Sequence, residues 1–290
     1  MISMTWTAAI ALTLACAPTS PSTVGTEKPA QGPPTVVAEP ATPASPAALP
    51  AFDQSHARWT RILAKHVDGD RIDYKAIKKD RSELDAYLKE LGSVTPAELA
   101  KWSEKERYAF WINVYNAFTV SLVVENYPVE SIKDIGSLLS SVWKKRFIPL
   151  TALDPEGKGQ ELSLDVVEHG ILRERFKDAR VHAAVNCASE SCPPLRNEAF
   201  VAKRIDAQLD EQVRAWLADS KRNRYDRKNN EINVSAIFDW FESDFERDAG
   251  SVQKWIAKYA PESEASWIRS AKGLDIEHLD YSWELNEVKR

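Results

Sequence analysis

The segment ERYAFWINVYNAFTVSLVVENYP, residues 106–128, is the densest apolar stretch of the chain and decides how the rest of it folds. Its apolar residues cover almost every face over about six helical turns, and Asn126 and Pro128 mark its end. A helix that is apolar on all sides lies inside a protein rather than on its surface. The sequence therefore predicts a long, buried central helix.

Two amides lie within this apolar segment. Asn113 and Asn116 are three residues apart, so they share one face of the predicted helix. A buried amide is costly unless its donor and acceptor atoms find partners. One interpretation is that both side chains hold the backbone of a neighbouring loop. The other is that they border a cleft, where Asn116 orients a substrate or a catalytic group.

The other elements are predicted from shorter patterns. Thr95, Pro96 and Glu98 form a capping box with proline at the first helical position, so a helix begins there. Helical periodicity predicts further helices at 55–66, 82–91, 164–176, 198–219 and 251–260. Strands are predicted at 146–150, at 179–185 and from residue 231, and residues 274–286 are predicted to be extended. We expect an α+β fold, a helix-rich single domain with a small β-sheet.

The N-terminal part of the chain has a different composition. Residues 1–16, MISMTWTAAIALTLAC, are typical of a lipoprotein-like signal peptide, in which Cys16 is acylated and becomes the mature N-terminus. Residues 17–50 contain nine of the sixteen prolines and no aromatic residue, so 17–51 is predicted to be a Pro/Ala-rich disordered linker. Residues 52–290 remain for the globular domain.

These features predict a protein of the cell envelope. We expect a lipid on Cys16 to hold the domain on a membrane, facing the periplasm. The alternative is a plain cleaved signal and a secreted soluble protein. The net charge is -5 with both signs interspersed, so no basic block recommends a nucleic-acid partner. We expect no cofactor.

Four motifs together resemble the domain of unknown function 547 family, which is found in bacterial envelope proteins and in plant proteins. The resemblance spans about residues 56–286, and its motifs are FWINVYNAF (110–118), LDVVEHGILR (164–173), RVHAAVNCASESCPPL (180–195) and LDYSWELN (279–286). The family commonly has Tyr-Asp-Trp in the last motif, whereas this chain has Ser282 at the acidic position. The resemblance implies a shared fold but no established reaction, so function must be argued from the site.

The stretch VHAAVNCASESCPPL, residues 181–195, holds the candidate catalytic residues. In a strand, His182 and Cys187 face opposite sides, so the chain must bend before the two can meet. The two prolines that follow favour the start of another helix, which would place Cys192 near its N-terminus and acidify its thiol. One hypothesis is that Cys187 or Cys192 is a nucleophile with His182 as its base, oriented by Asn116.

The same two cysteines allow other interpretations. In an oxidising envelope, Cys187 and Cys192 are close enough in sequence to form a disulfide that staples the loop. A labile redox site is a further alternative. A zinc site is not expected, because His182 and the two thiols supply three ligands and His169 would have to arrive from the preceding helix.

The remaining polar candidates have plain structural interpretations as well. In a helix, His169 shares a face with Asp165 and can pair with it at the surface, and Glu168 is its neighbour in sequence. His56, His66 and His278 belong to no motif and are expected on the surface. The ten tryptophans are expected mainly in the core and along a cleft, with carbohydrate or peptide stacking as a lesser possibility.

Two classes of function fit this sequence. The first is a non-enzymatic envelope module that binds a partner or a cell-wall component. The second is a thiol-dependent hydrolase or transferase that acts on a peptide or acyl bond. Composition does not choose between them, whereas the oxidation state of the cysteines would, because a disulfide removes the thiolate that such an enzyme needs.

Overall fold

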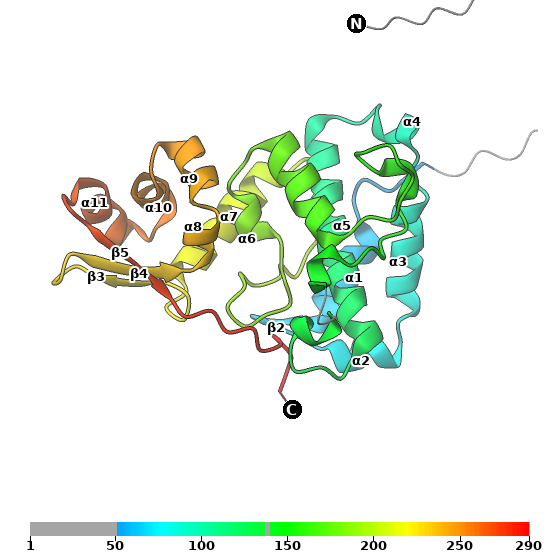
Figure 1. Ribbon diagram of the computed structural model, residues 1–290, viewed down its shortest axis with the longest axis horizontal. Coiled ribbons are helices and arrows are strands. Elements are labelled where there is room, and N and C mark those ends of the chain that lie inside the picture. Colours follow the sequence, from blue (N-terminus) through cyan, green and yellow to red (C-terminus); the bar gives the residue numbers. More distant parts are fainter. Residues whose placement is uncertain (1–50, 137–139, 290) are drawn as a thin grey trace, which may run out of the picture. The chain divides into compact units, whose positions relative to one another are not determined.

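The structure, a computed structural model, describes residues 51–136 and 140–289 (Figure 1). The predicted signal peptide with its Cys16, and all of the predicted linker except residue 51, lie outside these residues. Within the described ranges, no helix is both long enough and apolar enough to cross a membrane. The described residues form a helix-rich α+β fold with small sheets, which confirms the predicted fold class.

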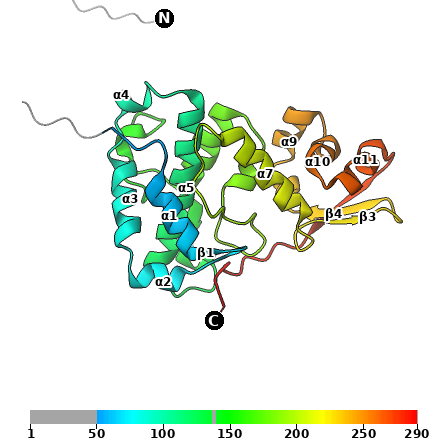
Figure 2. The same ribbon diagram turned by 180° about the vertical axis from the view of Figure 1, so that it is seen from behind.

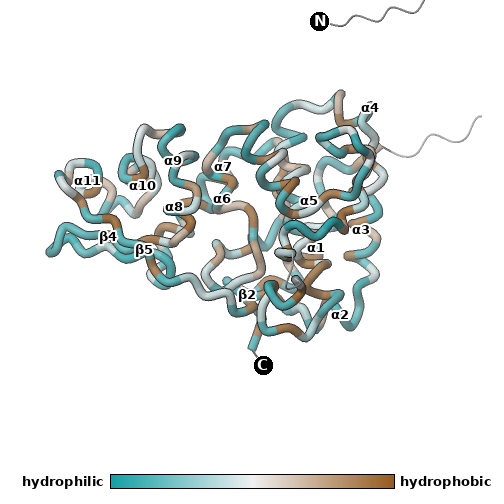
Figure 3. The backbone as a smooth tube through the Cα atoms, viewed as in Figure 1, coloured by the Kyte–Doolittle hydropathy of each residue, from teal (hydrophilic) through white to brown (hydrophobic). Residues whose placement is uncertain are grey.

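The central helix is α5 (Glu104–Asn126). Ser103 caps it with a capping box, because its side chain accepts from the backbone of Glu106 and the Glu106 carboxylate accepts from the backbone of Ser103. Every residue from Tyr108 to Val124 is buried, and apolar positions recur along α5 in Figure 3. The predicted buried central helix is confirmed, two residues longer at its start.

Helices from the first part of the chain surround α5. They are α1 (Ala57–His66), α2 (Tyr74–Lys79), α3 (Ser82–Gly92) and α4 (Pro96–Leu99), with a short hairpin of β1 (Val67–Asp68) and β2 (Arg71–Ile72). The helices α2 and α3 pack against α5, and α1 packs on α3, where the rings of Trp59 and Tyr87 stack. The buried residues around α5 form one hydrophobic cluster, here called the α5 core.

After α5 the chain forms three short 3₁₀ helices and one wide helix. They are η1 (Ile132–Ile135), η2 (Val142–Lys144), η3 (Thr151–Leu153) and the π-helix η4 (Val166–Phe176). The single turn α6 (Val181–Ala184) and the helix α7 (Ile205–Ala218) follow. The π-helix packs along α5. Such helices are rare and occur often at functional sites.

The C-terminal part of the chain builds a sheet covered by helices. Its elements are β3 (Arg224–Asp226), β4 (Glu231–Ser235), α8 (Ile237–Trp240), α9 (Glu242–Ala249), α10 (Val252–Tyr259), α11 (Glu262–Ser270) and β5 (Asp275–Leu279). The order is β3-β4-β5, with β3 antiparallel and β5 parallel to β4. Its buried residues, with Trp216, Phe238 and Trp255 among them, form a second cluster, here called the sheet core.

The helix α7 contributes side chains to both cores. Ile205 and Leu209 of α7 belong to the α5 core, whereas Val213 and Trp216 belong to the sheet core. Figure 2 shows α7 running from the side of α5 towards β4. A single amphipathic helix thus contributes to both clusters.

Several predicted elements are wrong in type or length. The strand predicted at 179–185 is instead the helical turn α6, because all four of its residues are buried and the turn packs against α7. The strand at 146–150 is reduced to one bridge between Ile148 and Leu162. The helix predicted at 198–219 begins only at Ile205, and no helix follows Pro194 directly.

Candidate functional site

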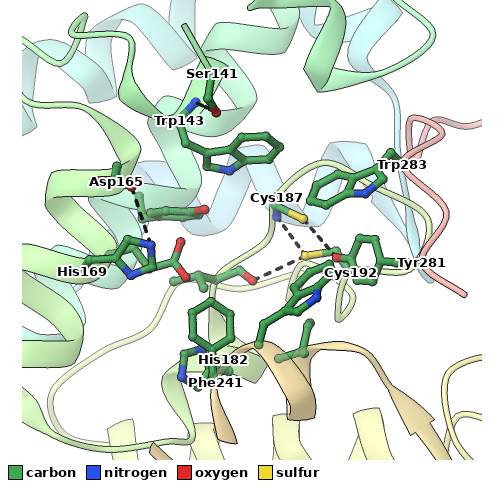
Figure 4. A pocket seen from close by; sticks show the side chains of 15 residues that line it. Ser141, Trp143, Asp165, His169, His182, Cys187, Cys192, Phe241, Tyr281 and Trp283 are labelled. Atoms are coloured by element: carbon green, nitrogen blue, oxygen red, sulfur yellow. Dashed lines mark hydrogen bonds and ion pairs between the residues drawn. The ribbon is translucent and has the colours of Figure 1, made fainter. Parts of the chain in front are cut away.

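A cavity of about 340 Å³ lies where the α5 core meets the sheet core (Figure 4). Its walls come from α5, η2, η4, α6, α8, the loop after α6 and the C-terminal segment. The lining residues are Tyr115, Ser141, Trp143, Asp165, Glu168, His169, His182, Val185, Cys187, Cys192, Ile237, Trp240, Phe241, Tyr281 and Trp283. Both cysteines and two histidines singled out in the sequence therefore share one cavity.

Two buried amides hold the loop that carries the cysteines. The side-chain nitrogen of Asn116 donates to the carbonyl of Ala184 at 2.9 Å, and its oxygen accepts from the backbone of Asn186 at 2.9 Å. Asn286 donates to the Asn186 side chain at 3.3 Å and accepts from Tyr74 at 2.8 Å. The oxygen and the nitrogen of the Asn116 amide thus each bond to the backbone of this loop, as the loop-holding interpretation predicts.

A buried arginine fixes the other end of the loop. Arg222 is 4% exposed, and its Nε donates to the carbonyl of Cys192 at 2.9 Å. Its guanidinium also donates to the carbonyl of Glu190 and to the Asp219 carboxylate. The positions of the two thiols are therefore set by polar contacts at both ends of a short loop.

Cys187 is a partly exposed free thiol in the cavity wall. Its Sγ lies 3.2 Å from Oγ of Ser189 and 3.3 Å from the hydroxyl of Tyr281, and Ser189 donates to Tyr281 at 3.1 Å. The side-chain hydrogen bond with Cys192 lowers the pKa of Cys187, and those with Ser189 and Tyr281 lower it further, which together outweigh the effect of burial. A lowered pKa increases the fraction of thiolate, which is the form of cysteine that acts as a nucleophile.

Cys192 differs from Cys187 in its exposure and in the direction of its pKa shift. It is 3% exposed, its Sγ accepts a hydrogen bond from the backbone N–H of Cys187 at 2.9 Å, and it donates to the carbonyl of Val185 at 3.7 Å. Burial raises its pKa well above the ordinary value, and the neighbouring Cys187 raises it further. The expected acidification of Cys192 at a helix N-terminus is wrong, because no helix begins there. The predicted disulfide is not seen, since both cysteines are free thiols.

His182 is buried and paired with a carboxylate that the sequence analysis did not identify. Its Nε2 lies 2.8 Å from Oδ2 of Asp244, which also accepts from Arg173 at 2.6 Å. Burial lowers the pKa of His182, partly offset by the hydrogen bond with Asp244. Burial raises the pKa of Asp244, but hydrogen bonds from His182 and Arg173 outweigh it and hold that pKa well below its usual range. His182 is therefore a neutral imidazole beside the charged carboxylate of Asp244.

The imidazole of His182 does not touch either thiol. It stacks on Phe241 with ring centroids 4.1 Å apart, and in the described part of the chain its Nδ1 has no hydrogen-bond partner. Because the carboxylate of Asp244 accepts the Nε2 proton, Nδ1 is the unprotonated nitrogen. The structure therefore brings His182 and Cys187 to one cavity without the direct contact that a Cys-His pair would have.

The other predicted polar residues divide between the cavity and the core. Glu168 and His169 line the cavity from η4. Glu168 is buried and accepts from the hydroxyl of Tyr115. His169 lies 3.7 Å from Asp165, which confirms the expected pair. Asn113 is outside the cavity, where it exchanges two hydrogen bonds with the backbone of Phe200, at 2.8 and 3.1 Å.

Aromatic rings form one side of the cavity. Tyr281 and Trp283 lie 4.7 Å apart by ring centroids, Trp240 stacks on Trp283 at 5.9 Å, and Trp143 meets Trp283 edge-on at 5.1 Å. Trp240 is 45% exposed, although nearly all large apolar side chains of the described residues are covered. The Nζ of Lys133 lies 3.9 Å above the ring of Trp283. An exposed aromatic surface beside a thiol suits the binding of an organic ligand.

Sequence reasoning missed three residues of this site. Asp244 lies 62 residues after His182, so no local spacing connects them. Arg222 stands in a charged turn that is typical of a solvated loop. Tyr281 lies in the motif LDYSWELN, but sequence periodicity does not show that its hydroxyl lies close to the sulfur of Cys187. Among the described residues, no group of three or more His, Cys, Asp or Glu side chains is placed to hold a metal ion.

Fold and site together define a helix-rich α+β domain with a thiol-lined cavity. Residues 99–217 match the family model described as Protein of unknown function, DUF547, and so carry that domain. The match includes α5, η4 and both cysteines but ends before Asp244 and Tyr281. No curated protein matches the chain. No solved structure matches it either.

Proposed function

We propose that the domain is a thiol-dependent hydrolase or transferase that acts on a peptide or acyl bond, with Cys187 as its nucleophile. The observation that carries the proposal is the free thiol of Cys187, which lines the cavity and has a lowered pKa. A thiolate is the reactive form of cysteine, so a lowered pKa increases the reactive fraction at neutral pH.

The reaction has two steps. The sulfur of Cys187 bonds to the acyl carbon, the bond to the leaving group breaks, and the thiol proton goes to the leaving group. A water molecule or another acceptor then attacks the thioester, gives its proton to Nδ1 of His182, and Cys187 takes up a proton as it leaves. Asp244 holds the Nε2 proton of His182 and so keeps Nδ1 available as the base.

The test is acylation of the full chain with Cys16→Ser by an activated ester, followed by intact mass and peptide mapping. We expect one acyl group on Cys187, absent in Cys187→Ser. His182→Gln is expected to keep the acylation and to slow the loss of the acyl group by about 10² to 10⁴-fold. Cys192→Ala serves as the control for a nearby thiol. Acylation that is spread over lysines, with Cys187 unmodified, would refute the proposal.

A binding role is the second candidate, and the exposed ring of Trp240 beside Tyr281 and Trp283 supports it. Rings of this kind stack on the faces of sugars and on peptide side chains. Titration with cell-wall oligosaccharides and peptides should quench tryptophan fluorescence, and Trp240→Ala should weaken binding at least about tenfold. Tight binding that survives this substitution would place the ligand elsewhere.

We further propose that the domain is exported and held on a membrane by a lipid on Cys16, with residues 17–51 as a linker. The composition of residues 1–51 supports this proposal. Fractionation should find the protein with membranes, and Cys16→Ser should release it. Intact-mass analysis that finds an unacylated N-terminus at another residue would rule out the lipoprotein.

A further inference from the structure

The thiol of Cys192 is a buried nucleophilic group that the proposed reaction does not use. It lies against Cys187, whose backbone N–H donates to its Sγ at 2.9 Å. The polar contacts of Arg222 and Asn186 hold the intervening residues in place. The two sulfur atoms are therefore kept together as free thiols.

The environments of the two thiols differ in a way that matters for oxidation. Cys187 is partly exposed and borders the cavity, where its Sγ lies 3.2 Å from Oγ of Ser189 and 3.3 Å from the hydroxyl of Tyr281. Cys192 is 3% exposed. Oxidants react with accessible thiolates, and a second thiol close by traps the product before it is oxidised further. One accessible and one buried thiol in contact are the arrangement of a reactive and a resolving cysteine.

We propose that Cys187 is a site of oxidation by hydroperoxides and that Cys192 is its resolving thiol. The thiolate of Cys187 attacks the distal oxygen of the peroxide, the O–O bond breaks, and Cys187 becomes a sulfenic acid. The alkoxide or hydroxide that leaves takes up the proton that the Cys187 thiol released and becomes an alcohol or water. The sulfur of Cys192 then bonds to that of Cys187, hydroxide leaves, and the proton of Cys192 converts it to water. The peroxide is reduced by two electrons and the thiol pair is oxidised to a disulfide.

The consequence is a reversible block of the nucleophile in the cavity. A short loop that closes into a disulfide protects Cys187 from irreversible oxidation, and a dithiol reductant restores it. This inference does not depend on the acyl-transfer reaction, because it needs only the two thiols and a peroxide small enough to enter the cavity of about 340 Å³.

The experiment uses the reduced full chain with Cys16→Ser, so that only two cysteines remain. One equivalent of hydrogen peroxide should lower the intact mass by about 2 Da, with Cys187 and Cys192 linked in the peptide map, and dithiothreitol should reverse the change. In Cys192→Ser, dimedone should label Cys187, and excess peroxide should add about 32 Da. In Cys187→Ser, thiol loss should slow at least about tenfold, because Cys192 is buried.

Circular dichroism checks that each variant is folded. If a variant does not fold, the protein that keeps both Cys187 and Cys192 decides the outcome. A Cys187 that accumulates as sulfenic or sulfinic acid in the presence of Cys192 would overturn the proposal, as would oxidation that begins at Cys192. Neither outcome bears on acylation by activated esters, so the two proposals fail separately.

Discussion

At the scale of single residues, the surroundings of Cys187 are formed by groups that are distant in the sequence. The hydroxyl of Tyr281 lies 3.3 Å from its sulfur, 94 residues further along the chain. The cysteines and His182 were predictable, because they are rare residue types gathered in one short segment. Their partners Tyr281 and Asp244 were not, because tyrosines and aspartates are common and only the tertiary fold selects these two.

Replacing Tyr281 by Phe should raise the pKa of Cys187. The substitution removes one hydrogen-bond donor to the thiolate and keeps the ring that packs against Trp240 and Trp283. The rate of alkylation near neutral pH should fall about three- to tenfold, with the pH profile displaced upward. The control is Tyr127→Phe, which loses a hydroxyl bonded to Glu287 instead. An unchanged profile would mean that Tyr281 does not stabilise the thiolate.

Replacing Arg222 should lower the free energy of unfolding far more than replacing its neighbour Lys221. Arg222→Gln leaves the carbonyls of Glu190 and Cys192 and the carboxylate of Asp219 without their buried partner. We expect the free energy of unfolding to fall by about 2 to 4 kcal/mol, measured with denaturant.

Lys221→Gln is the matched control, since Lys221 is exposed and meets Asp70 at the surface at 3.0 Å. Its effect should stay within about 0.5 kcal/mol. Equal effects of the two substitutions would show that the arginine does not fix the loop.

At the scale of elements, local patterns identified the helices with their own cap or period and failed where tertiary packing decides. The continuous apolarity of α5 lies in adjacent positions of the sequence, and the prediction of this helix was confirmed. The segment around α6 has the β-branched and alternating residues of a strand, yet it is buried against α7 as a single helical turn. Residues 198–204 have helical period. Backbone N–H groups of this segment instead donate to the side chains of Asn113 and Gln208.

Asn113→Ala and Asn116→Ala should each lower the free energy of unfolding by about 1 to 3 kcal/mol. Each amide joins α5 to a separate backbone segment, at Phe200 and at Ala184 with Asn186, and alanine leaves those buried groups unpaired. Chemical denaturation of both variants measures the effect.

The comparison is Asn126→Ala at the exposed end of α5, whose side chain bonds only to Leu122 of the same helix. Its effect should be within about 0.5 kcal/mol. If the two core variants unfold at the wild-type denaturant concentration, their amides do not contribute to holding these segments on α5.

At the scale of the whole molecule, the two cores and the cavity between them follow from contacts that span long distances in the chain. The sequence predicted one helix-rich domain because no proline-rich break interrupts residues 52–290. The sequence did not predict that α7 contributes to both cores. The apolar residues of α7 follow one continuous helical period, which does not tell the two cores apart. The same limitation explains the error on His56, which was expected on the surface and is 1% exposed.

His56 should make the free energy of unfolding of the whole domain depend on pH in the acidic range. Its Nδ1 lies 2.7 Å from the hydroxyl of Tyr87, and its buried Nε2 has no hydrogen-bond partner among residues 51–136 and 140–289. Burial lowers the pKa of His56 from 6.5 to about 4, although nearby Asp53 opposes the shift. The folded protein thus keeps His56 neutral between those two pH values, whereas the unfolded chain binds a proton there.

Because the unfolded state binds more protons in that window, stability is greatest above pH 6.5 and falls as the pH approaches 4. His56 alone should account for a loss of about 2 to 3 kcal/mol between pH 7.5 and pH 4.5. Urea unfolding at both pH values measures the loss, and His56→Gln should reduce it by this amount. His278→Gln, at an exposed position on β5, should keep the wild-type difference. If His56→Gln and wild type lose equal stability on acidification, His56 is not held neutral in the fold.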